Sequence, residues 1–163
     1  MLSIDCFITT NFKRPYLLSL TERALYLSGF CPILIDKPLL ERYFECERLA
    51  TSDLYILSDD DVIPASRSTL GELIEIMREH PEYSQLGLSW KGISKENPII
   101  RRRGALWELD YVGRLMVIRK GTIKPLDNEF ELHKEDGKAM GDIARKQGLK
   151  VGIVPNLFFH NLG

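Results

Sequence analysis

The sequence predicts an α/β fold in which a mixed, mainly parallel sheet is flanked by helices. Short β-prone runs alternate with helical patterns in the first half, and a helix followed by a strand closes the second half. The chain has 163 residues, of which 44% are apolar, so it can bury one sizeable core but is too short for two ordinary domains. We therefore predict a single domain over residues 1–163.

The first strands and helices are separated by residues that end one element or begin the next. Residues 3–9 are apolar and β-prone, and Pro15 opens a helical pattern that runs to about Ser28. Residues 32–35 give a second short strand, and Pro38 opens a second helix. Two strand–helix units are therefore expected within the first third of the chain.

A third unit carries the most polar strand end in the sequence. Residues 54–57 are a continuous apolar run, typical of a buried parallel strand, and this run ends abruptly in Asp59, Asp60 and Asp61. An amphipathic helix with apolar residues at helical spacing follows Pro64. Since ligands bind beyond the carboxyl ends of parallel strands, the three aspartates are expected at the ligand-binding edge.

The second half is less regular. Residues 85–90 and 111–118 are expected to form strands, separated by a surface loop that contains Arg101 to Arg103. A last helix should end at Gly148, and a final strand should cover residues 150–154 and stop before Pro155.

Charge and cysteine content exclude several classes of protein. The formal net charge is −1, so no global field would draw the chain onto nucleic acid or an anionic membrane. The three cysteines are widely spaced and odd in number, which fits free thiols better than a zinc cluster or a disulfide framework. No stretch approaches the ~20 apolar residues of a membrane span. We expect a soluble, cytoplasmic protein.

The three adjacent aspartates predict a cation site. Like charges at the end of a buried strand are unfavourable unless a cation or a set of hydrogen-bond donors compensates them. Mg²⁺ or Mn²⁺ would suit, because these cations prefer carboxylate oxygens and bind through few protein ligands together with substrate phosphates. Asp59 and Asp61 would share the metal and ribose contacts. The alternative is an acidic turn that only caps the next helix.

Several segments together resemble the nucleotide-sugar glycosyltransferases of the GT-A fold, especially the family 2 type. LYILSDDDVIP resembles their Asp-x-Asp (DxD) segment, and FITTNFKRPYLLSLTERAL is similar to their opening strand and helix. ILID resembles the second strand, and YVGRLMVIRKGTI resembles the acceptor-side strand. HKEDGKAMGDIARKQGLKVGIVPNLFFHNLG is similar to their Glu-Asp segment, helix and closing strand. The resemblance covers nearly the whole chain.

The resemblance implies a role for each of these segments. It makes Asp136 the catalytic base, with Glu135 as the rival, and it makes His160 a metal or diphosphate ligand beside Asp59 and Asp61. Each residue also has a plain structural alternative: an acid pair at a helix N-terminus, an exposed histidine, or solvated helix charges. The residues that would bind the nucleotide sugar and its diphosphate are Thr9, Thr10, Asn11, Arg14, Asp36, Arg48, Asp59 and Asp60.

The implied reaction is transfer of one hexose or pentose from a nucleoside-diphosphate sugar to an acceptor hydroxyl, with a divalent metal (Mn²⁺ or Mg²⁺) and inversion at the anomeric carbon. The acceptor stays open: a glycan, a small molecule, or, as in phage-type transferases, DNA with hydroxymethylated bases, which the run from Arg101 to Arg103 would suit. The alternatives are a nucleotidyltransferase and a non-catalytic nucleotide-sugar-binding module. The loop TTNFKRP has no glycine, which speaks against the nucleotidyltransferase.

Overall fold

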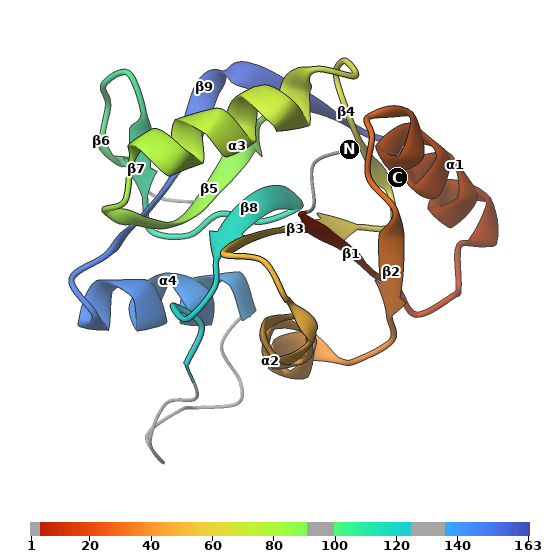
Figure 1. The fold of residues 1–163 in the computed structure, drawn as a ribbon, viewed down its shortest axis with the longest axis horizontal. Coiled ribbons are helices and arrows are strands. Elements are labelled where there is room, and N and C mark those ends of the chain that lie inside the picture. Colours follow the sequence, from red (N-terminus) through yellow and green to blue (C-terminus); the bar gives the residue numbers. More distant parts are fainter. Residues whose placement is uncertain (1–3, 91–99, 125–135) are drawn as a thin grey trace.

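A computed structural model of the chain describes residues 4–90, 100–124 and 136–163. Within these ranges one nine-stranded sheet has the strand order β2-β1-β3-β8-β5-β9-β7-β6, and β4 pairs with β9 outside this path (Figure 1). The strands are β1 (Asp5–Thr9), β2 (Pro32–Ile35), β3 (Leu54–Asp59), β4 (Val62–Pro64), β5 (Tyr83–Ser89), β6 (Ile100–Arg102), β7 (Trp107–Leu109), β8 (Leu115–Arg119) and β9 (Lys150–Asn161). The helices are α1 (Pro15–Leu27), α2 (Leu39–Leu49), α3 (Thr69–Glu79) and α4 (Asp136–Lys146).

The sheet is mixed, as the sequence predicts. Strands β2, β1 and β3 run parallel to one another, and β5 runs parallel to β9. Strand β8 lies between β3 and β5 and is antiparallel to both, so these five parallel strands all point in the same direction. Their carboxyl ends therefore meet at one edge of the sheet, where Thr9 is in register with both Ile35 and Asp59.

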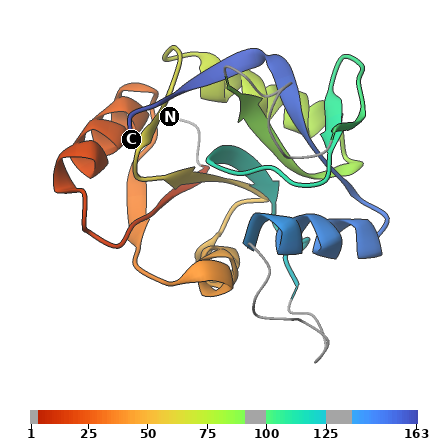
Figure 2. The same cartoon turned by 180° about the vertical axis from the view of Figure 1, so that it is seen from behind.

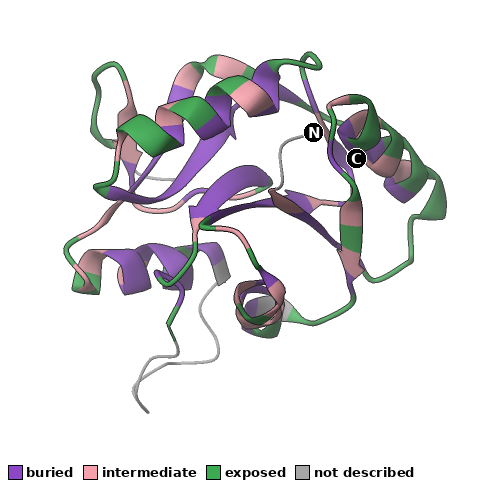
Figure 3. Cartoon of the chain, in the orientation of Figure 1, coloured by how far each residue is buried: buried purple, intermediate pink, exposed green. Residues whose placement is uncertain are grey.

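Helices cover both faces of the sheet (Figures 1 and 2). Side chains alternate along each strand, so Phe7 packs with α2 and α4 on one face, while Ile8 packs with α1 and α3 on the other. The buried positions follow the strands and the inner stripes of the helices, and the exposed positions follow the outer helix faces (Figure 3). This double covering fixes the position of the sheet edge that carries the aspartates.

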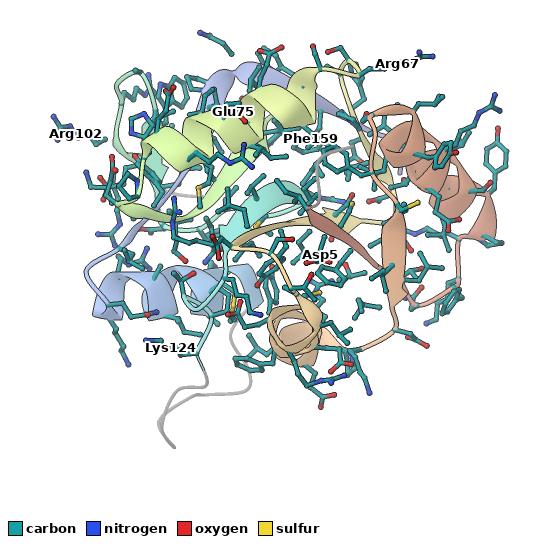
Figure 4. The ribbon with its side chains drawn as sticks, in the orientation of Figure 1. Asp5, Arg67, Glu75, Arg102, Lys124 and Phe159 are labelled. Atoms are coloured by element: carbon teal, nitrogen blue, oxygen red, sulfur yellow. The ribbon has the colours of Figure 1, made fainter. Side chains whose placement is uncertain are left out.

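The structure differs from the sequence expectation at several places. The strand expected over residues 111–118 is shorter, because β8 begins only at Leu115. The arginine run is not a loop: Ile100–Arg102 forms edge strand β6 against β7, and the side chain of Arg102 points away from this hairpin (Figure 4). Charged side chains are usual on edge strands, because they discourage pairing with other chains.

The final strand is also longer than expected, since β9 continues through Pro155 to Asn161. The pairing of β5 with β9 shifts register between Val154 and Phe158, so the missing N–H of Pro155 falls where the ladder is already interrupted. The last residues of β9 then pair with β4, which the sequence did not predict. No helix in the described ranges has the length and apolar character needed to cross a membrane.

Candidate nucleotide-sugar site

A pocket of about 440 Å³ opens where the carboxyl ends of β1, β2 and β3 meet. This is the edge at which the sequence places a ligand. The pocket combines backbone loops, hydroxyl and amide groups, and charges of both signs. Its lining residues are Thr9, Thr10, Asn11, Arg14, Asp36, Lys37, Pro38, Arg42, Asp59 and Asp60.

The loop between β1 and α1 is held by its own polar side chains. The Thr10 hydroxyl accepts a hydrogen bond from the Phe12 N–H at 3.0 Å, and the Asn11 side-chain oxygen accepts one from the Lys13 N–H at 3.0 Å. Phe12 adopts a φ of 58°, which is uncommon for a bulky residue and costs backbone strain. The strained turn aims the start of α1, and with it Arg14, at the acidic strand end.

Arg14 bridges the two buried carboxylates. Its Nη2 lies 2.6 Å from Asp60 Oδ1, and its Nη1 lies 2.7 Å from Asp61 Oδ2. Each carboxylate side chain is only 4% exposed, whereas that of Arg14 is 46% exposed. The hydrogen bond to Asp61 is the largest influence that raises the pKa of Arg14 above its ordinary value. The guanidinium therefore remains charged and keeps one side toward the pocket.

Two more arginines approach the acidic run, Arg114 at Asp61 and Asp59, and Arg42 at Asp59. Arg114 Nη1 lies 3.1 Å from Asp61 Oδ1 and 3.6 Å from Asp59 Oδ2. Arg42 Nη1 lies 4.0 Å from Asp59 Oδ1 and donates to the Thr9 hydroxyl oxygen at 3.4 Å. Arg114 has a φ of 71°, so it too holds its position at some cost in backbone strain. The repulsion among the three aspartates is thus relieved by guanidinium groups from three separate segments.

The charges around the pocket balance. Among the residues that line it, Arg14, Lys37 and Arg42 accompany Asp36, Asp59 and Asp60. Outside the lining, the ion pair of Arg114 and Asp61 adds one charge of each sign. Among the described residues that line the pocket or contact its aspartates, the charged side chains therefore have no surplus of negative charge.

The described residues do not fit the metal site that the sequence predicts. All four oxygens of Asp60 and Asp61 lie within hydrogen-bond distance of protein donors from Arg14, Arg114 and Thr10. His160 is exposed on β9, in register with Ile63 of β4. Within the part of the chain that the structure describes, no three His, Cys, Asp or Glu side chains gather as a set that could hold a metal ion.

The pocket gathers most of the residues expected to bind a nucleotide sugar. Arg48 is the exception: it is exposed on α2 and pairs with Glu45 at 2.7 Å, outside the pocket lining. The residues brought together at the pocket are Thr9, Thr10, Asn11, Arg14, Asp36, Asp59 and Asp60.

The two candidate bases lie at the start of α4. Asp136 is the first residue of this helix, and Glu135 lies outside the described residues. The helix start packs closely on the segment before β8, because a Cβ at Gly137 would lie 3.1 Å from the Tyr111 ring. That segment continues to Arg114, which contacts the aspartates. The backbone of Asp136 is therefore connected to the site through a short, packed segment.

Sequence reasoning missed two arginines of the site. Arg42 lies on the first turns of α2, directly after the second strand, and that position was a signal for a residue close to the sheet edge. Arg114 gave no such signal, because its contact with Asp61 joins segments 53 residues apart.

The strand order and the pocket at the parallel strand ends define the class of fold: it is the GT-A fold of the nucleotide-sugar glycosyltransferases. A mannosyltransferase from Pyrobaculum calidifontis, solved with GDP-Man and Mn²⁺, superposes with a TM-score of 0.70 at 10% identity, over 98% of this chain and 56% of its own. This chain therefore spans little more than half of that relative's length.

Two further solved structures share the fold. A Drosophila β-1,4-galactosyltransferase 7 mutant, solved with manganese, UDP-Gal and xylobiose, gives a TM-score of 0.59 at 13% identity, over 98% of this chain and 71% of its own. A197 from STIV gives a TM-score of 0.60 at 10% identity, over 96% of this chain and 83% of its own. No protein-family model matches the sequence, and no curated protein matches it.

Proposed function

We propose that the protein is a glycosyltransferase that binds a nucleoside-diphosphate sugar in the pocket at the ends of β1, β2 and β3. The observation that carries this proposal is the coincidence of fold and lining: a GT-A sheet presents Thr10, Asn11 and Asp36 at its ligand-binding edge. Solved neighbours of this fold are complexes with GDP-Man, UDP-Gal or UDP-GlcNAc.

Within this proposal, each strand end binds a different part of the donor. Asp36, at the end of β2, accepts hydrogen bonds from the ribose or the base, and Asp59, at the end of β3, lies toward the diphosphate and sugar. Arg14 faces the diphosphate, because a guanidinium can pair two phosphate oxygens at once. The opposite charges that line the pocket thus have separate partners on one ligand.

The proposed chemistry is a direct displacement with Asp136 as the base. An acceptor hydroxyl attacks the anomeric carbon, its proton passes to the Asp136 carboxylate, and the bond from that carbon to the diphosphate breaks. The nucleoside diphosphate leaves with the bonding electrons, and the anomeric centre inverts. Because one carboxylate activates one hydroxyl, no covalent sugar intermediate is required.

The sequence further predicts that Mn²⁺ or Mg²⁺ bridges Asp59, Asp61 and His160. Two of the solved neighbours contain manganese. The arrangement of the described residues does not supply the ligand set, so metal dependence stays a prediction, and no step above is routed through a metal.

A panel of nucleoside diphosphates tests donor binding. Uridine, guanosine, thymidine and cytidine diphosphates are added to the protein, with and without Mn²⁺, and thermal unfolding is followed. A ligand that binds only the native state raises the apparent stability, so one nucleotide should raise Tm by several degrees at about 100 times its Kd. If no nucleotide moves Tm under either condition, the proposal is wrong.

Replacing the proposed base separates catalysis from binding. Asp136→Asn should lower the transfer rate by about 10²–10⁴-fold and leave the Tm shift with the nucleotide intact, because the amide cannot accept the proton. Transfer is measured as release of nucleoside diphosphate from the matching sugar donor. A non-catalytic binding module would show the Tm shift but no turnover in the unsubstituted chain.

A further inference from the structure

We infer that arginine side chains, rather than a divalent cation, neutralise both the acidic strand end and the diphosphate of the donor. The inference rests on the proposed function, because it concerns how the same pocket binds its nucleotide. The cations that it assigns are Arg14 and Arg42, which line the pocket, and Arg114, which lies outside the lining and pairs with Asp61.

The first step concerns the carboxylates. Asp60 receives a hydrogen bond from Arg14 on one oxygen and from the Thr10 hydroxyl, at 2.7 Å, on the other. One carboxylate oxygen of Asp61 accepts a hydrogen bond from Arg14, and the other accepts one from Arg114. Mg²⁺ and Mn²⁺ usually keep several waters when proteins bind them, and two almost fully buried carboxylates leave little room for a hydrated ion. These two acids therefore serve as anchors for arginines.

The second step concerns the capacity of Arg14 for a further ligand. A guanidinium has five N–H groups in a planar fork, and the bonds to Asp60 and Asp61 use two of them. The side chain is almost half exposed and lines the pocket. Two N–H groups of the planar guanidinium can thus hold the carboxylates while the remaining N–H groups bind phosphate oxygens.

The third step adds a second cation from another element. Arg42 of α2 lines the pocket, and its Nη1 lies 3.4 Å from the Thr9 hydroxyl oxygen and 4.0 Å from Asp59 Oδ1. Arg14 directly precedes α1 and Arg42 lies in α2, and these two helices pack on opposite faces of the sheet. A diphosphate bound between them would meet positive charge from two directions.

The fourth step is the charge balance. Acidic and basic groups around the pocket cancel before any ligand binds. The balanced side-chain charges favour neither sign of ligand, so hydrogen-bonding capacity decides. The oxygens of Asp60 and Asp61 already accept hydrogen bonds, whereas Arg14 has N–H groups left for a diphosphate. Arginine side chains of the protein thus supply the positive charge that the aspartates require.

The test compares donor binding without metal and with metal. UDP, GDP, dTDP and CDP are each titrated calorimetrically into the full chain, once in EDTA and once in Mn²⁺. The nucleotide that binds should have a Kd in EDTA that is within about twofold of its Kd in Mn²⁺. In EDTA, Arg42→Gln should weaken binding by about tenfold, because it removes a charge-assisted contact to phosphate.

Arg78→Gln is the matched control. Arg78 is also a helix arginine with an acidic partner, but that partner is Glu75 of the same helix, α3, and Arg78 lies outside the pocket lining. The Kd of the Arg78→Gln variant should therefore equal that of the unsubstituted chain. The comparison between EDTA and Mn²⁺ uses the unsubstituted chain, so it decides the question even if Arg42→Gln fails to fold.

The possible failures are distinguishable. Binding that occurs in Mn²⁺ and disappears in EDTA would overturn the arginine assignment, support the metal prediction from the sequence, and leave the proposed function standing. Binding that survives EDTA but is unaffected by Arg42→Gln would also overturn the assignment of Arg42. The absence of binding under both conditions would refute the proposed function itself, and with it this inference.

Discussion

Asp61 is held more firmly than its neighbour Asp59, although both belong to one acidic run. Asp61 is buried between Arg14 and Arg114, and its backbone oxygen also accepts a hydrogen bond from the Leu162 N–H at 2.7 Å. The Asp59 side chain is 30% exposed and faces the pocket. The two residues should therefore differ in their contributions to stability.

Substitution of each residue by asparagine tests this difference. Asp61→Asn should lower the free energy of unfolding by about 1–3 kcal/mol, because it leaves two arginines poorly paired, and their partial exposure moderates the loss. Asp59→Asn should cost less than about 1 kcal/mol. Urea unfolding followed by circular dichroism measures both. Equal losses for the two variants would show that the ion pairs of Asp61 add no more to stability than those of Asp59.

Residue chemistry alone predicted that the three aspartates need compensation, and the sequence analysis assigned that role to a divalent cation. The sequence argument allowed either a cation or a set of donors, and the structure supplies donors from Arg14, Arg42 and Arg114. These contacts join residues that are far apart in the chain, and neither charge nor periodicity specifies such pairs. Arg48, which the sequence analysis placed with the nucleotide-binding residues, lies outside the pocket lining and pairs with Glu45 on its own helix.

At the scale of elements, two helical glycines differ in what surrounds them. A Cβ at Gly141 in α4 would lie 1.9 Å from the backbone oxygen of Asp110, so this helix packs directly against the main chain of the neighbouring segment. A Cβ at Gly71 in α3 would meet nothing within 4 Å. The close approach at Gly141 holds α4, and the proposed base at its start, against the sheet.

Alanine substitutions should therefore have opposite effects. Gly141→Ala should destabilise the fold by about 1–3 kcal/mol, because backbone atoms cannot give way to the added methyl group as a flexible side chain would. Gly71→Ala should stabilise it by up to about 1 kcal/mol, because alanine loses less conformational entropy in a helix. Thermal unfolding of both variants measures the difference. A stabilising Gly141→Ala would mean that α4 does not pack this closely.

The elements that the sequence predicted are those with their own periodic or apolar signal. The helix over Thr69–Glu79 and the strand over Pro32–Ile35 agree closely with the pattern. The short strands Val62–Pro64, Ile100–Arg102 and Trp107–Leu109 have no such signal, since each has only three residues and exists through its pairing with a partner. Strand pairing between distant segments is not encoded in local propensity.

At the scale of the whole molecule, the three cysteines report on the integrity of the core. Cys6 and Cys46 are buried on opposite faces of the sheet, and burial raises the pKa of each thiol to about 12. Cys31 is exposed in the turn before β2. Because the thiolate is the reactive species, only Cys31 is available to a thiol reagent in the folded protein.

Thiol titration with a chromogenic disulfide at pH 8 should count one reactive group per chain in buffer and three in denaturant. A Cys31→Ser variant should reduce the native count to zero and keep the denatured count at two. Rapid reaction of a second thiol in buffer would show that one face of the sheet opens easily.

The pairing of β4 with the end of β9 has a consequence for how the protein acquires its activity. These strands join parts of the chain separated by roughly a hundred residues. Contacts between residues so far apart in the sequence form late in folding, because closing a long loop costs entropy. The turn that bears Asp60 and Asp61 lies immediately before β4, so it reaches its final geometry only when β4 has paired with β9. During refolding, nucleotide affinity should consequently appear after most helical signal has returned.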